Sequence, residues 1–154
     1  MKITIISIGK FENSVHRSVF DTYLKRMKWT IELKEFELKN ANNLNAIQVK
    51  EGEAQLIAKA IKAGSVVIAL DEKGKGFSSQ NFAKLIADFS VKGDSHLTFI
   101  IGGANGLATE ILNRANLKIS LSLMTFPHLM VRSILLEQLY RAQSIIAGHP
   151  YHRE

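Results

Sequence analysis

The chain has 154 residues, 46% of them hydrophobic and 22% charged, and no cysteine. This length and composition predict one compact domain over residues 1–154. The lack of cysteine excludes disulfides and cysteine-based zinc sites and suits a cytoplasmic protein. No apolar run approaches the roughly 18 residues of a membrane span, so we expect a soluble, unprocessed protein with no membrane partner. Twenty Lys and Arg against fourteen Asp and Glu, a net charge of +6, favour a polyanionic partner.

The first half of the chain predicts alternating strands and helices. Residues 2–8 are a β-branched run typical of a strand covered on both faces. An apolar stripe over residues 15–27 indicates a helix whose polar side is mostly basic. A second strand is expected over residues 31–38, an Asn-rich loop over residues 39–45 and a helix over residues 46–63.

The middle of the chain continues this alternation. A short apolar strand is expected over residues 65–70, ended by Asp71 and followed by a turn-rich loop at residues 72–77. Ser78 or Ser79 is expected to cap the next helix.

The last third of the chain completes the pattern. We expect a buried strand over residues 97–101, a short helix over residues 109–114 and a last strand over residues 117–123. A long helix is predicted from Val131 to a stop at Gly148. The regular alternation predicts an α/β fold with a mostly parallel sheet and helices on both faces.

Ligands of such sheets bind beyond the carboxyl ends of the strands, here in the loops after Leu70, Ile101 and Leu123. The loop after Ile101 holds Gly102 and Gly103, and it serves equally as a tight structural turn or as a loop on which a ligand lies. Its glycine spacing is that of neither dinucleotide-binding nor phosphate-binding loops.

Several side chains have both a functional and a structural interpretation. Asp71 and Glu72 are possible metal ligands, although no third ligand accompanies them and a solvated strand end is favoured. His128 is interpreted first as a packed or capping histidine. The residues after the last helix, 149–154, are either a solvated terminus or a group that positions a polar substrate.

Six motifs, taken together, resemble one known family over essentially the whole chain. They are Ala69-Leu70-Asp71, Gly74-Lys75-Gly76, the glycines at 102, 103 and 106, LSLMTFPH at 121–128, EQLYRA at 137–142 and HPYHRE at 149–154. The chain resembles the SPOUT-class ribosomal large-subunit methyltransferase H family, the 23S rRNA pseudouridine-1915 N3-methyltransferases.

The resemblance implies a knotted SPOUT fold in which the C-terminal segment threads through a loop, forming a trefoil knot. It also implies an S-adenosylmethionine-dependent enzyme, a cytoplasmic homodimer, that methylates N3 of pseudouridine 1915 of 23S rRNA in assembled ribosomes. A chain this small has no separate RNA-binding domain, so a dimer surface would supply recognition. Leu129, Met130 and Leu136, off the main stripe of the last helix, are predicted to contribute to that surface.

The resemblance also implies which residues hold the cofactor, and no metal is expected. S-adenosylmethionine would be held by Leu70, Gly102, Gly103, Leu121, Ser122, Leu123, Met124, Thr125 and Phe126. The apolar members of residues 121–126 would line a slot for the adenine ring. Tyr151 or His152 would assist removal of the imide proton, and Arg153 would stabilise negative charge or bind phosphate.

Two other classes of function remain open at this point. A non-catalytic RNA-binding protein would use the basic side of the first helix and would bind no cofactor. A nucleotide-dependent α/β enzyme, such as an oxidoreductase, is disfavoured by the glycine spacing.

Overall fold

The computed structural model describes residues 1–11 and 14–153, so Glu154, the last residue of the predicted tail, lies outside the described part. Strands and helices alternate along the chain. They are β1 (Lys2–Ile8), α1 (Val15–Leu24), β2 (Thr30–Phe36), a short 3-10 helix (Ala41–Asn43), α2 (Ala46–Ala60), β3 (Val66–Gly76), α3 (Ser79–Val91), β4 (His96–Ile101), α4 (Thr109–Arg114), β5 (Leu117–Ser120) and α5 (His128–Ile146).

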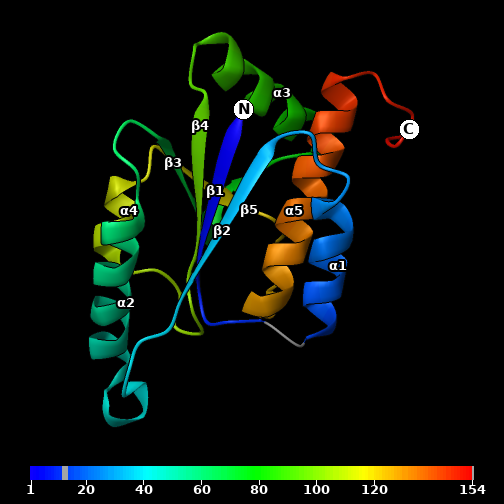
Figure 1. Ribbon diagram of the computed structural model, residues 1–154. Helices are drawn as coiled ribbons and strands as arrows, with labels where there is room; N and C mark the ends of the chain where they lie inside the picture. The colour runs from blue at the N-terminus through cyan, green and yellow to red at the C-terminus, as the bar shows by residue number, and fades with distance from the viewer. Residues whose placement is uncertain (12–13, 154) are drawn as a thin grey trace.

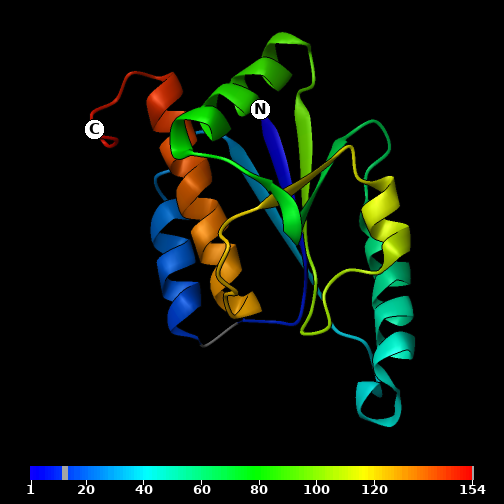
Figure 2. The same ribbon diagram turned by 180° about the vertical axis from the view of Figure 1, so that it is seen from behind.

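The five strands form one sheet in the order β2-β1-β4-β3-β5, and each neighbouring pair is parallel. Helices α1, α3 and α5 cover one face of this sheet, and α2 and α4 cover the other (Figures 1 and 2). The prediction of an α/β fold with helices on both faces is therefore confirmed. The strands are parallel, and their carboxyl ends face the side of the sheet on which α5 starts (Figure 1).

The central strands are buried because both faces of the sheet are covered. Ile3 and Ile5 of β1 pack in the core shared with α1, α3 and α5, whereas Ile6 and Ile8 pack in the core shared with α2 and α4. Successive side chains of a strand point to opposite faces, so a strand with a helical layer on each side needs apolar residues at both. This arrangement explains the nearly continuous apolar run at residues 2–8.

Side-chain caps define the starts of α1, α2 and α3. The Ser78 side chain accepts a hydrogen bond from the backbone N–H of Asn81, as one of the two sequence alternatives predicted. At α2, Asn45 and Gln48 form a capping box in which each side chain bonds to the other residue's backbone N–H. Helix α2 ends at Ala60, three residues before the predicted end.

Strand β3 differs from the prediction, which ended it at Asp71. It continues to Gly76, because Lys75 and Gly76 pair with β5 after a shift in register. Leu70 and Lys75 both pair with Ile119, so the residues between them bulge out of the ladder. Gly74 permits this close approach, since a Cβ there would lie 2.5 Å from the carbonyl carbon of Ile119.

Two further boundaries differ from the prediction. Strand β5 ends at Ser120 rather than at residue 123, and α5 starts at His128 rather than at Val131. Residues 121–127 are therefore a connection across the carboxyl edge of the sheet. Leu136, predicted to lie on a dimer surface, is instead fully buried within its own subunit. In the part of the chain that the structure describes, no helix has the length and apolar character of a membrane span.

Candidate cofactor site

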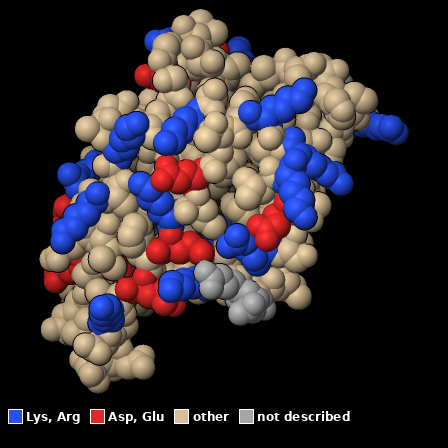
Figure 3. All heavy atoms as spheres, in the orientation of Figure 1, with Lys and Arg blue, Asp and Glu red and all other residues tan. Residues whose placement is uncertain are grey.

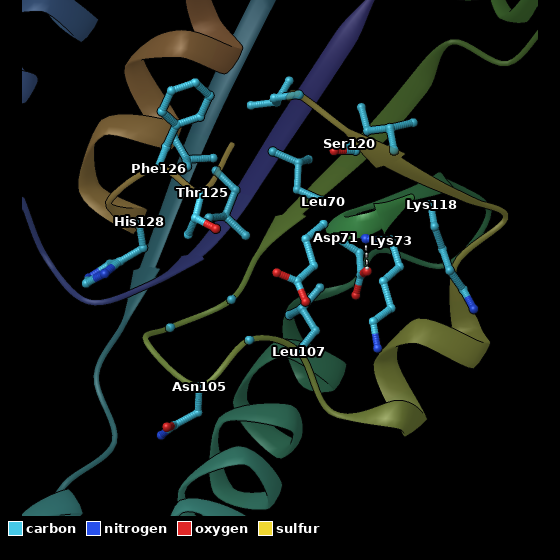
Figure 4. A pocket seen from close by; sticks show the side chains of 18 of the residues that line it. Leu70, Asp71, Lys73, Asn105, Leu107, Lys118, Ser120, Thr125, Phe126 and His128 are labelled. Atoms are coloured by element: carbon cyan, nitrogen blue, oxygen red, sulfur yellow. Dashed lines mark hydrogen bonds between the residues drawn. The ribbon is translucent and has the colours of Figure 1, made fainter. Parts of the chain in front are cut away.

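A pocket of about 860 Å³ lies at the carboxyl ends of β3, β4 and β5. Its walls come from the bulge of β3, the glycine loop after β4, the connection from β5 to α5 and the first turn of α5 (Figure 4). This volume falls in the usual range for sites that enclose a small organic ligand. The three loops chosen from the sequence therefore meet in one place.

The pocket lining includes all the predicted cofactor residues except Leu123. These residues are Leu70, Gly102, Gly103, Leu121, Ser122, Met124, Thr125 and Phe126. The Leu123 side chain is fully exposed and is not part of the pocket lining in this chain. An apolar residue in a short connection has no periodic pattern to indicate which way it points.

The glycine loop is a tight turn that also lines the pocket. Gly106 donates its backbone N–H to the Gly103 carbonyl at 3.0 Å, and its φ of 73° is one that glycine adopts readily. A Cβ on Gly102 would lie 2.9 Å from the carbonyl carbon of Gly106. The protein's own packing thus requires these glycines, whatever ligand the loop contacts.

Glu53 of α2 lies behind this loop and was missed by the sequence analysis. It is only 8% exposed, and its Oε1 atom would be 2.9 Å from a Cβ on Gly103. Burial raises the pKa of the Glu53 carboxyl, because the charged form loses hydration. The spacing in the sequence could have indicated its burial. Glu53 lies one residue before Ala54 and four before Ile57, and both of these are on the buried side of α2.

The bulge of β3 is shaped by Asp71. Its Oδ1 atom accepts a hydrogen bond from the backbone N–H of Lys73 at 2.7 Å (Figure 4). Such a local bond stabilises a turn without a metal ion. Among the residues that the structure describes, no group of three His, Asp or Glu is arranged to hold a metal.

The connection from β5 to α5 is fixed by two serines. The Ser120 hydroxyl donates to the Ser122 carbonyl at 2.7 Å, and the Met124 backbone N–H donates to the Ser122 hydroxyl at 2.9 Å. Figure 4 shows Thr125 and Phe126 beside the open space, with Leu70 across it. The wall of the pocket here combines apolar side chains with polar main chain.

The first turns of α5 form one wall of the pocket, and a buried arginine lies behind that wall. His128 lines the pocket, and one turn later Arg132 is completely buried. Arg132 donates to the Glu35 carboxylate at 2.7 Å and to the Ile8 carbonyl. Burial, together with the charge of Arg132, lowers the pKa of His128. Of the two structural interpretations of His128, packed or capping, the structure shows a half-buried side chain beside Gly9 and no side-chain cap at the start of α5.

The tail packs against the other end of α5. The Tyr151 hydroxyl donates to the Glu137 carboxylate at 3.0 Å and lies 3.2 Å from the Tyr23 hydroxyl. His152 Nδ1 lies 3.2 Å from the Arg141 guanidinium, which covers the Tyr151 ring at 4.8 Å. Burial and the hydrogen bonds to Tyr23 and Glu137 raise the pKa of Tyr151.

The structure therefore overturns the simplest interpretation of the tail, in which all of it extends freely into solvent. Only Arg153 of the three predicted catalytic residues is exposed. The tail nevertheless does not reach the pocket of its own chain. Glu137 lies nine residues beyond His128, or about 14 Å of helix rise. In Figure 1 the tail lies beside the upper end of α5, whereas the pocket is lined by the first turn of α5, at the lower end of that helix.

Comparison with known proteins decides the family. The family described as predicted SPOUT methyltransferase matches residues 1–152. The chain belongs to the SPOUT methyltransferase family. A relative from Acetivibrio thermocellus, named ribosomal RNA large subunit methyltransferase H, is 42% identical over 99% of this chain and 100% of its own. A relative of the same name from Rhodospirillum centenum is 38% identical over 99% of both chains.

Solved structures of methylase family proteins share the fold of this SPOUT methyltransferase. One from Haemophilus influenzae has a TM-score of 0.59 at 15% identity, covering 99% of this chain and 70% of its own. One from Neisseria gonorrhoeae has a TM-score of 0.56 at 11% identity, covering 99% and 86%. At these identities the likeness concerns the fold alone.

The family implies a methyl donor of the S-adenosylmethionine type, and the pocket has a suitable lining. An adenine ring requires apolar walls with polar groups at their edge. Leu70, Leu107 and Phe126 supply apolar walls, and the main chain of the glycine loop and of residues 121–126 supplies donors and acceptors. The pocket therefore fits such a donor by its volume and by the chemistry of its walls.

Proposed function

We propose that this SPOUT methyltransferase methylates 23S rRNA, at N3 of pseudouridine 1915, with S-adenosylmethionine as donor. The observation that carries the proposal is the meeting of the three strand-end loops in one pocket of about 860 Å³. Support for the RNA substrate comes from the two relatives, whose names are those of ribosomal RNA methyltransferases and which align along their whole length. The excess of basic residues favours the same substrate class.

The proposed cofactor contacts are mainly with the main chain. Backbone groups at Gly102, Gly103 and residues 121–126 would bind the polar parts of the donor. Leu70 and Phe126 would hold the adenine ring between them. Because these contacts use backbone atoms, they depend on the turn after β4 and on the two serine bonds after β5.

The chemistry requires alignment and the removal of one proton. When bound, S-adenosylmethionine supplies a methyl group activated by the adjacent sulfonium. The protein must place the acceptor nitrogen in line with that group and exclude water. The imide nitrogen carries a proton near neutral pH, and the tail would assist its loss through His152 or Tyr151. Arg153 would stabilise the charge that develops on the adjacent carbonyl oxygen.

We propose that the tail acts on the pocket of a second subunit. Within one chain, Tyr151 is held against Glu137 and cannot approach the pocket while these contacts persist. A homodimer in which α5 of each subunit faces the other would bring one tail to the opposite pocket. Cyclic dimers generate two such composite sites from a single contact.

Exposed apolar side chains support a dimer surface beside α5. Val15 and Val19 lie one turn apart on α1 and are 77% and 46% exposed. Leu123 and Met124, after β5, are also exposed. Large exposed apolar groups mark interaction surfaces when they gather on one side of a protein.

The trefoil knot, the cytoplasmic location and the need for assembled ribosomes stay predictions.

A calorimetric titration followed by methyl transfer tests this function. The protein should bind S-adenosylmethionine saturably and transfer its labelled methyl group to 23S rRNA in intact ribosomes. Activity should weaken as salt rises and should be low on a short naked hairpin, because recognition is assigned to shape and phosphate contacts. A protein that binds ribosomes but no S-adenosylmethionine would instead be a non-catalytic RNA-binding protein. Saturable binding of a nicotinamide dinucleotide in its place would indicate an oxidoreductase.

A further inference from the structure

The end of α1 and the C-terminal tail meet on one side of α5. One hydrogen bond joins these segments, which are far apart in the sequence, and a second joins the residues after α1 to α5 itself. The Tyr23 and Tyr151 hydroxyls are 3.2 Å apart, and the Lys28 backbone N–H donates to the Gln143 side chain at 2.8 Å. Residues 25–28 and residues 151–153 are therefore neighbours in the folded chain.

Four cations project from this region, and we call them the basic cluster. They are Lys25, Arg26, Lys28 and Arg153, all of them exposed. Within residues 1–11 and 14–153, none of the four forms an ion pair. Figure 3 shows lysine and arginine side chains gathered at its upper right, over the end of α1 and beside the tail.

The acidic groups of the two helices do not neutralise this cluster. Asp21 is the carboxylate of α1, and it is paired with Arg17 at 2.9 Å. Glu137 is the carboxylate of α5, and it is paired with Arg141 and accepts from Tyr151. The charges at the rim of the pocket are of both signs, because Lys50, Lys73 and Lys118 lie there together with Asp71 and Glu72. Among residues 1–11 and 14–153, cations without an ion-paired carboxylate thus gather beside the tail.

We propose that the basic cluster binds RNA phosphates next to the nucleotide that is methylated. This inference rests on the proposed function, in which the tail reaches the pocket of the second subunit. Phosphates held at residues 25–28 would bring the acceptor base to the same tail that assists loss of its proton. Phosphate suits this surface because flexible, exposed, unpaired cations bind a polyanion without the shape complementarity that a folded protein partner requires.

Two matched double variants test the proposal. Lys25→Gln with Lys28→Gln removes two charges at the end of α1. Lys59→Gln with Lys62→Gln removes two exposed charges at the same spacing at the end of α2, on the other face of the sheet. Ribosome affinity and methyl transfer are measured for both variants over a range of salt concentrations. Because the side chains of Lys25 and Lys28 make no contact with the pocket, S-adenosylmethionine affinity should not change.

The α1 variant should raise the KM for ribosomes about tenfold and leave kcat unchanged. The slope of log affinity against log salt should become shallower by roughly 1.5, as expected for two lost phosphate contacts. The α2 variant should behave like the wild type. Equal KM values and salt slopes for the α1 variant and the wild type would overturn the inference, while wild-type methylation would keep the proposed function standing.

Protein-free 23S rRNA separates RNA from a ribosomal protein as the partner. The loss of affinity in the α1 variant should be the same, as a ratio to wild type, on protein-free rRNA and on ribosomes. A loss of affinity seen only on ribosomes would indicate that the basic cluster binds a ribosomal protein, and it would overturn the inference. If the wild type transfers no methyl group to 23S rRNA in intact ribosomes, the proposed function fails instead.

Discussion

The two ends of α5 are built in different ways. At its first turn, the pocket is formed by main chain, glycines and apolar side chains from three loops. At its last turns, the tail is held by a network of long side chains, with Glu137 accepting hydrogen bonds from both Arg141 and Tyr151. No residue of the tail lines the pocket, among the residues that the structure describes.

The two ends of α5 are therefore expected to serve different steps, cofactor binding at the pocket and methyl transfer at the tail. A site made of main chain is set by the fold and is lost only when a loop is distorted or filled. A site made of terminal side chains can be removed with little effect on the fold. Cofactor binding and methyl transfer should therefore respond to different changes.

Removal of residues 151–154 should have the largest effect on activity. Methyl transfer should fall by a factor on the order of a hundred or more, the usual scale for loss of acid–base and charge-stabilising groups. The free energy of unfolding should fall by only about 1 kcal/mol, because the Tyr151 contacts are partly exposed. Affinity for S-adenosylmethionine, measured by calorimetry, should be unchanged. Wild-type turnover on ribosomes would remove the tail from the mechanism.

Two tryptophan substitutions in the same connection test which of its residues contact the cofactor. Thr125 lines the pocket and is exposed to it, whereas Leu123 is outside the lining. Thr125→Trp should weaken S-adenosylmethionine binding at least about tenfold, since overfilling a site costs more than about 1.4 kcal/mol. Leu123→Trp should leave the affinity unchanged. Equal affinities for the two variants would mean that the cofactor lies elsewhere.

Glu53 should give the smallest effect, on stability rather than on transfer. Its pKa is raised by burial, so the folded state holds this proton more tightly than the unfolded state. The contribution of Glu53 is most favourable at low pH and is lost as the pH rises through the raised pKa. Glu53→Gln should therefore increase the free energy of unfolding at neutral pH, by on the order of 1 kcal/mol.

The free energy of unfolding is measured with denaturant between about pH 5 and 8. In this range most proteins are near their maximal stability. Glu51→Gln, an exposed carboxylate on the same helix, is the matched control and should not change the pH dependence. A Glu53→Gln protein that keeps the wild-type pH dependence would show that Glu53 is not the group responsible.

Much of the fold could be predicted from local pattern. The buried strands at residues 2–8 and 97–101 are short apolar runs with clear ends, and most helices have regular stripes. The extension of β3 could not be predicted, because residues 72–76 are charged or glycine and their pairing depends on Ile119 far along the chain. Register between distant strands is a property of the folded sheet, not of either segment.

The candidate site shows the same limit. The three loops could be predicted because parallel strands present their carboxyl ends at one edge of the sheet. The outward direction of Leu123, the burial of Arg132 and the docking of Tyr151 on Tyr23 could not. The last contact joins residues 128 positions apart and depends on how α1 packs against α5.

Mixed dimers test most directly whether one subunit supplies the pocket and the other the tail. A subunit lacking residues 151–154 and a Thr125→Trp subunit, carrying different affinity tags, are coexpressed and purified as the heterodimer. At an S-adenosylmethionine concentration well below the wild-type Kd, each parent homodimer should show about a tenth of the wild-type activity or less. If the tail acts across the dimer, the heterodimer contains one complete site of two and should show about half of the wild-type methyl transfer on ribosomes. A heterodimer no more active than its parents would contradict the account, because it would place pocket and tail in the same subunit.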